Sequence, residues 1–181
     1  MFERKNASIL ALVLLMNVAA AATPSPAAAG TAAEAAPKEG KTLANVDQNG
    51  VILEGYDTVA FHTEKKPVLG EAQFQSKWNG AIYHFASAAN KALFDADPAK
   101  YAPQYGAFCA YAVSVNRLRP IDIHLFHFVE GRLMFQHSQK AFDLYHQDVA
   151  GNTVKADGYW PKLVTKKGGK WKAGKFDQPA K

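Results

Sequence analysis

The chain of 181 residues has a single cysteine, Cys109. One cysteine cannot form a disulfide within its own chain, so the thiol is free, bound to a metal or paired with another molecule. The sequence also lacks a glycine-rich phosphate loop, a Cys-x-x-Cys-His haem attachment and a serine in a nucleophile elbow. Because no nucleophile stands beside a base, we expect a protein that is not an enzyme.

No apolar run beyond the N-terminal segment is long enough to cross a membrane. That segment combines charged residues 3–5, the short apolar run Ala7–Ala19 and the small residues Ala20–Ala22. The combination is typical of a secretory signal peptide over residues 1–22, with an uncleaved anchor as the alternative. We therefore expect a periplasmic protein with no stable membrane span after cleavage. An exposed thiol is at risk in the oxidising periplasm, which favours burial or ligation of Cys109.

The formal net charge of +5 is concentrated at the C-terminus, where residues 162–181 hold seven lysines and one aspartate. The rest of the mature chain is slightly acidic, so we expect no nucleic-acid partner. Residues 23–42 are rich in Ala and Pro and predict a flexible linker. Residues 43–164 form the predicted domain. Residues 165–181 predict a flexible basic tail, for which contact with an anionic envelope surface is the alternative.

Two hairpins are predicted from local patterns. Asn79-Gly80 separates the apolar runs Phe74–Trp78 and Ala81–Phe85, and an Asn-Gly pair in that position is a strong hairpin signal. Glu130-Gly131 separates residues 126–130 from 132–136 in the same way. Val59–His62 is predicted as a further short strand.

Helices are predicted where a serine precedes an amphipathic stretch. Ser87 is expected to cap a helix over 88–95, ended by Asp97-Pro98, and Ser138 a helix over 139–147. A short helix over residues 154–163 is expected to end near Pro161. Phe94 and Tyr101 are expected in the core. Strands, hairpins and interspersed short helices favour an α+β fold with a small antiparallel sheet.

Several stretches together resemble the YHS-domain family. The family signature is matched by Gly80–Ser87, followed by Asn90, Phe94, Pro98 and Tyr101. Two further stretches, Gly55–Phe61 and Tyr105–Ala110, look like the secreted bacterial branch of the family. The resemblance covers residues 52–163 and implies a YHS-like fold. Metal-handling members of the family that this chain resembles have cysteines at the positions that match Ala60, Ala86 and Asn90. The resemblance therefore implies that the usual set of thiol ligands is absent here.

Two histidines offer a replacement ligand set. His62 lies two residues after Ala60, and His84 lies two residues before Ala86, so strand alternation places each on the face of a lost cysteine. Cys109 then completes a Cys109, His84 and His62 site, which suits copper or, as the alternative, zinc.

Two functions follow as hypotheses. The first is an exported YHS-domain protein that binds a soft transition metal, copper above all, for envelope metal trafficking or tolerance. The alternative is a non-catalytic periplasmic interaction module without a metal site, whose aromatic pocket binds a peptide or a small apolar ligand. An envelope protein is the expected macromolecular partner.

Overall fold

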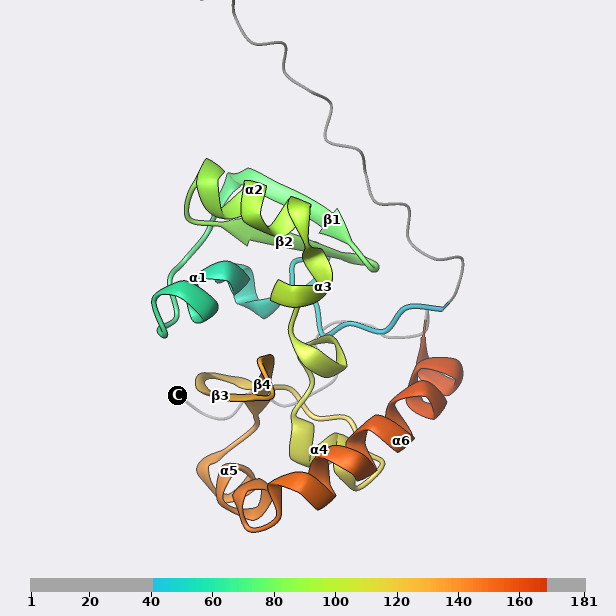
Figure 1. Ribbon diagram of the computed structural model, residues 1–181. Helices are drawn as coiled ribbons and strands as arrows, with labels where there is room; N and C mark the ends of the chain where they lie inside the picture. Colours follow the sequence, from blue (N-terminus) through green and yellow to red (C-terminus); the bar gives the residue numbers. More distant parts are fainter. Residues whose placement is uncertain (1–40, 169–181) are drawn as a thin grey trace, which may run out of the picture. The chain divides into compact units, whose positions relative to one another are not determined.

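The computed structural model describes residues 41–168, which fall within one compact unit. The predicted signal peptide, most of the predicted linker and the tail from residue 169 lie outside the described residues. The described part is mixed α+β and contains two antiparallel sheets of two strands each (Figure 1). This confirms the predicted fold class.

The elements follow one another with short connections. In chain order they are the 3-10 helix η1 (Leu53–Gly55), α1 (Thr58–Thr63), β1 (Glu71–Trp78), β2 (Ala81–Phe85), α2 (Ala88–Ala96), α3 (Pro98–Tyr101), the 3-10 helix η2 (Gln104–Ala107), α4 (Ala110–Ser114), β3 (Asp122–Val129), β4 (Arg132–Gln136), α5 (Gln139–His146) and α6 (Val149–Lys167). Within residues 41–168 no helix combines the length and the apolarity that crossing a bilayer requires.

Both predicted hairpins are confirmed. Strand β1 pairs with β2 and β3 pairs with β4, each pair joined by a turn of two residues. The turns place Asn79 and Gly80 at φ 49° and 82°, and Glu130 and Gly131 at φ 52° and 77°. A two-residue turn with positive φ at both positions matches the twist of the strands that it joins.

Both predicted helix caps are confirmed. Ser87 Oγ accepts a hydrogen bond from the backbone N–H of Asn90 at 3.1 Å, and Ser138 Oγ accepts one from Ala141 at 3.3 Å. Helix α2 stops before Pro98, which occupies the first position of α3. Phe94 on α2 is 1% exposed and Tyr101 is 7% exposed, so both lie in the core as expected.

The predicted strand over Val59–His62 is wrong, because these residues belong to helix α1. The side chain of Asp57 precedes them and accepts hydrogen bonds from the N–H groups of Val59 and Ala60 at 2.8 and 3.3 Å. An aspartate at the N-cap satisfies donors that a strand would need to pair elsewhere. The apolar run is therefore a buried helical turn.

Helix α6 differs from its prediction at both ends. It begins at Val149, where Asp148 caps it, and runs through Pro161 to Lys167. Pro161 lies inside the helix and is exposed. The buried residues Ala156 and Leu163 lie on the inner face, and this packing continues the helix past the proline.

The chain folds the same supersecondary unit twice. Strands β1 and β2 and helices α2 and α3 begin at residues 71, 81, 88 and 98, and β3, β4, α5 and α6 begin at 122, 132, 139 and 149. Each element of the second set therefore starts 51 residues after its counterpart, as η2 does after η1. We call residues 53–101 the first unit and residues 104–167 the second unit.

Local irregularities repeat with the same spacing. Glu71 pairs with Phe85 and Asp122 with Gln136, and a register shift follows each pair. Asp97 and Asp148, which cap α3 and α6, share φ −151° and have ψ 76° and 74°. Matching bulges and caps would not recur by composition alone, so the two units are copies of one fold.

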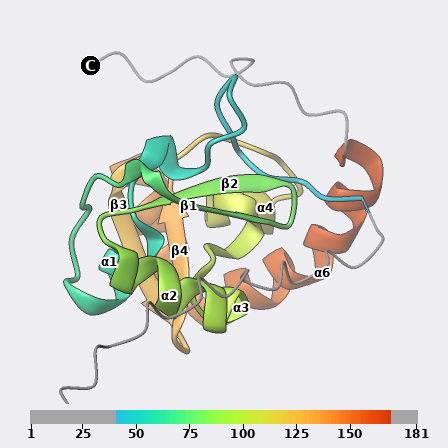
Figure 2. The ribbon, with the colours of Figure 1, turned by 90° about the horizontal axis from the view of Figure 1, so that it is seen from above.

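The units share one apolar core. It contains Phe61, Phe85 and Phe94 from the first unit and Leu133 and Phe135 from the second. The rings of Phe61 and Phe135 meet edge to face with centroids 5.2 Å apart. Figure 2 shows the two hairpins running across each other.

Candidate functional site

Cys109 is a packed thiol at the N-terminus of helix α4. It is 1% exposed, and its Sγ donates to Gln136 Oε1 at 3.2 Å. The same sulfur accepts from the backbone N–H of Ala112 at 3.5 Å. Burial raises the pKa of the Cys109 thiol, although nearby backbone N–H groups partly oppose the rise. The expected burial is confirmed, and the protonated form predominates at neutral pH.

His84 lies on the outer face of strand β2. Its neighbours Tyr83 and Phe85 are buried, whereas His84 itself is half-buried on the opposite side. A Cβ atom at Gly55 would lie 3.6 Å from His84 Nδ1, and one at Gly70 would collide with the His84 backbone. Gly70 therefore leaves the room that His84 occupies, whereas a side chain at Gly55 would only touch the imidazole.

His62 lies on helix α1 between two aromatic rings. Its ring meets Tyr101 and Phe128 edge to face, with centroid distances of 5.2 and 4.9 Å. Its Nε2 is buried and has no hydrogen-bond partner in the described part of the chain. Burial lowers the pKa of His62, and the charge of Lys65 lowers it further. The imidazole is neutral at neutral pH.

These three residues have different neighbours. Residues 41–168 contain no group of three His, Cys, Asp or Glu side chains arranged to hold a metal ion. His62 does not share a strand face with Ala60, because both residues lie on helix α1. The set of Cys109, His84 and His62 therefore stays a prediction.

A different pair of imidazoles lies near the thiol. Gln136, which accepts from Cys109, has its Nε2 3.0 Å from His127 Nε2. The ring of His127 lies 4.7 Å from that of His146. Burial, with a smaller contribution from His146, lowers the pKa of His127 to about 4. Sequence spacing gave no signal for this pair, because β3 and α5 meet only in the tertiary fold.

The sequence also gave little warning of the role of Asp57. This fully buried carboxylate caps α1, and its Oδ2 accepts from the N–H of Ala86 at 2.8 Å and from Asn90 Nδ2 at 2.7 Å. It therefore joins α1, the end of β2 and the start of α2. Cys109 caps α4 in the second unit as Asp57 caps α1 in the first. The lone thiol thus occupies the position of a structural carboxylate.

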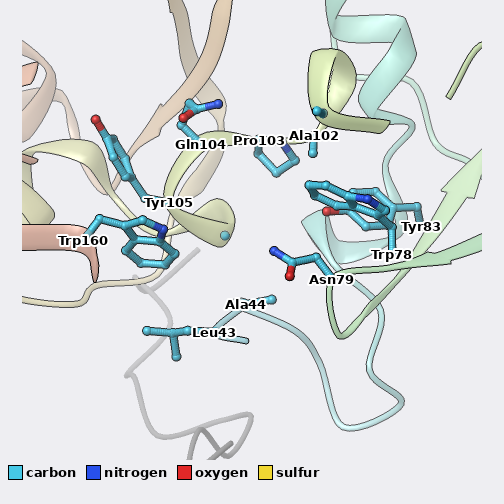
Figure 3. Close-up of a pocket in the computed structure, with 12 residues that line it drawn as sticks. Leu43, Ala44, Trp78, Asn79, Tyr83, Ala102, Pro103, Gln104, Tyr105 and Trp160 are labelled. Atoms are coloured by element: carbon cyan, nitrogen blue, oxygen red, sulfur yellow. The ribbon is translucent and has the colours of Figure 1, made fainter. Parts of the chain in front are cut away.

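An aromatic pocket of about 250 Å³ opens where the two units meet. Figure 3 shows Trp78 and Tyr83 on one side, Tyr105 and Trp160 on the other, and Asn79 between them. The tight turn after β1 presents Asn79. We call this the aromatic pocket; its other lining residues are Leu43, Ala44, Ala99, Ala102, Pro103, Gln104 and Gly106.

Two features hold the far wall of the aromatic pocket in place. Tyr105 donates its hydroxyl to Asp157 Oδ1 at 2.8 Å, and Arg132 binds the same carboxylate at 3.0 and 3.1 Å. A side chain at Gly106, which has φ 56°, would collide with the carbonyl of Leu43. The hydroxyl of Tyr105 is thus satisfied by Asp157, and its ring packs against that of Trp160 with centroids 5.8 Å apart.

Comparison with known proteins gives one family. Residues 59–105 match the YHS domain. The searches of curated proteins and of solved structures found no match. The matched residues run from α1 into η2, so they cover most of the first unit and end before Cys109. The chain therefore contains a YHS domain at residues 59–105.

Proposed function

We propose that this is an exported, non-catalytic binding protein whose aromatic pocket takes a small apolar ligand or an aromatic side chain of a peptide. The observation that carries the proposal is the pocket between the two units, walled by Trp78, Tyr83, Tyr105 and Trp160. Aromatic walls with a few convergent polar groups are typical of ligand sites.

The size and chemistry of the pocket define the ligand class. Sites for drug-sized molecules commonly measure about 300–1,000 Å³, so about 250 Å³ suits a single ring or one side chain. Asn79 and Gln104 are the uncharged polar side chains that line it, and no Asp, Glu, Lys or Arg does. A neutral aromatic group with one hydrogen-bonding substituent therefore fits best.

The surroundings of the thiol argue against covalent catalysis. The acceptor beside Cys109 is the amide oxygen of Gln136, which is not a base, and burial raises the pKa of the thiol. Ser114 Oγ donates to the backbone carbonyl of Tyr111 at 2.8 Å. Neither nucleophile is activated by a neighbouring base.

Binding of N-acetyl-phenylalaninamide, a neutral mimic of an aromatic side chain, tests this function by calorimetry. We expect saturable binding that Trp160→Leu weakens, because this change removes one wall of the pocket. Tyr159→Leu, which alters the aromatic residue next to Trp160 on helix α6 that does not line the pocket, is the matched control and should bind as the unchanged protein does. Equal binding by the two variants would refute the assignment.

Export belongs to the same proposal. It rests on the charged start, the apolar run and the small residues at 20–22. N-terminal sequencing of protein extracted from the cell envelope should begin at Thr23. Protein that retains Met1 in the cytosolic fraction would contradict it.

A metal-binding function is the second candidate, because the YHS domain is a proposed metal-binding domain. The candidate ligands are Cys109, His84 and His62, with copper as Cu(I) the preferred ion and zinc the alternative. Bound Cu(I) would need the thiolate, so the sulfur would have to release Gln136. Competition titration should show tight Cu(I) binding that Cys109→Ser abolishes and His146→Ala leaves unchanged. Binding no tighter than micromolar, or equal binding by Cys109→Ser, would remove this candidate.

A further inference from the structure

A second pocket adjoins the aromatic pocket, and Ala99 and Gln104 line both. It has a volume of about 530 Å³ and is more open to solvent. We call it the basic pocket; the residues that line it are His62, Lys65, Ala99, Lys100, Gln104, Phe128, Glu130, Gly131 and Arg132. The first unit supplies the two lysines, and the second unit supplies the arginine.

Cations dominate the lining of the basic pocket. Lys65, Lys100 and Arg132 face one acidic lining residue, Glu130. Within residues 41–168 neither lysine forms an ion pair with a carboxylate. Two unpaired ammonium groups around one concavity repel each other, and an anion between them relieves that repulsion.

The cationic groups are held in place by neighbouring side chains. Lys65 Nζ lies over the Phe128 ring, 4.4 Å from its centroid, and Lys100 Nζ lies 4.9 Å from the centroid of Tyr101. Arg132 is anchored by Asp157 through Nη1 alone. Its remaining N–H groups are therefore left for a ligand, since a guanidinium carries five.

We propose that the basic pocket binds a phosphate group. A dianion matches a pocket with two unpaired lysines and one partly engaged arginine better than a single carboxylate does. Lysine ammonium groups bind phosphate as point charges, and the guanidinium adds directional donors. The proposal is independent of the aromatic pocket, because the cationic residues line only the basic pocket.

The experiment titrates the mature chain with inorganic phosphate, against chloride at equal ionic strength, and follows binding by calorimetry. Lys65→Gln and Lys100→Gln should each weaken binding roughly tenfold, because each removes one close unit charge. Lys66→Gln is the matched control. Lys66 is adjacent in sequence and exposed, pairs with Glu64 at 3.2 Å, and does not line the pocket.

Vesicles containing phosphatidic acid, whose headgroup is a phosphomonoester, form the second arm and distinguish a lipid headgroup from free phosphate. Vesicle binding that falls in the Lys65→Gln, Lys100→Gln double variant but not in Lys66→Gln assigns the site to a lipid. Phosphate binding with the same dependence and no such vesicle effect assigns it to a free phosphate compound. In either case Trp160→Leu should leave binding unchanged, so the two pockets are tested separately.

Two results would overturn the proposal. One is the absence of saturable phosphate binding together with the absence of a pocket-dependent vesicle effect. The other is an equal loss in Lys66→Gln and Lys65→Gln, which would show that net charge, and not the pocket, attracts the anion.

Discussion

Replacing Asp57 by alanine should destabilise the fold more than any other single Asp→Ala change among the helix caps. The side chain is fully buried and accepts four hydrogen bonds, from the N–H groups of Val59, Ala60 and Ala86 and from the Asn90 amide. These donors belong to three segments, so the substitution loosens α1, β2 and α2 together.

The size of the effect follows from those contacts. Loss of an N-cap costs about 0.5–2 kcal/mol. Each buried donor left without a partner adds about 1–3 kcal/mol. The N–H of Ala86 and the side-chain amide of Asn90, both partly buried, are two further donors outside the cap. Taking the low end for each loss, Asp57→Ala should reduce the free energy of unfolding by roughly 2.5 kcal/mol or more. That is a large part of the stability of a typical domain.

Asp97→Ala is the matched control. Asp97 also caps a helix but is exposed, and its Oδ1 accepts one bond, from Lys100 N–H at 3.1 Å. Its removal should therefore cost about 1 kcal/mol. Urea unfolding with linear extrapolation measures both variants. If Asp57→Ala is no less stable than Asp97→Ala, the carboxylate does not join the three segments as described.

Three further predictions rest on buried side chains. Phe94→Ala should lower the free energy of unfolding by about 3–5 kcal/mol, measured in urea; an unchanged midpoint would place Phe94 outside the core. Cys109 should react with iodoacetamide at pH 8 far more slowly in the folded protein than in urea, because burial raises its pKa and blocks access; equal rates would contradict the packing. The stability of the fold should decline as the pH falls from about 6.5 to about 4, since the unfolded state binds the proton that folded His127 resists. His127→Gln should flatten this decline, and an identical slope would assign it to other groups.

The sequence predicted what is local. Both hairpins are specified by their two-residue turns. The helices after Ser87 and Ser138 are specified by caps whose hydroxyl oxygens accept from backbone N–H groups three residues further on. The strand predicted at Val59–His62 failed because a short apolar run fits a buried helix equally well. The helix is favoured over the strand because Asp57 caps it. The carboxylate of Asp57 also accepts two hydrogen bonds from residues about 30 positions away, which a local pattern does not contain.

The duplication and the location of the pockets could not be predicted from the sequence. The two units share backbone geometry at Ser87 and Ser138 and at Asp97 and Asp148, but few side chains repeat between them. The aromatic pocket needs Trp78 and Trp160 from different units, so no window of sequence contains it. The predicted ligands Cys109, His84 and His62 were chosen by strand phase, and the helical conformation of α1 removes that relation for His62.

The central claim is that the aromatic pocket is the binding site. Nitrogen-15 NMR resolves the indole N–H signals of the three tryptophans, two of which line the pocket. During titration with N-acetyl-phenylalaninamide, we expect saturable shifts of the Trp78 and Trp160 signals with one dissociation constant. Uniform small shifts of all three signals without saturation would contradict it.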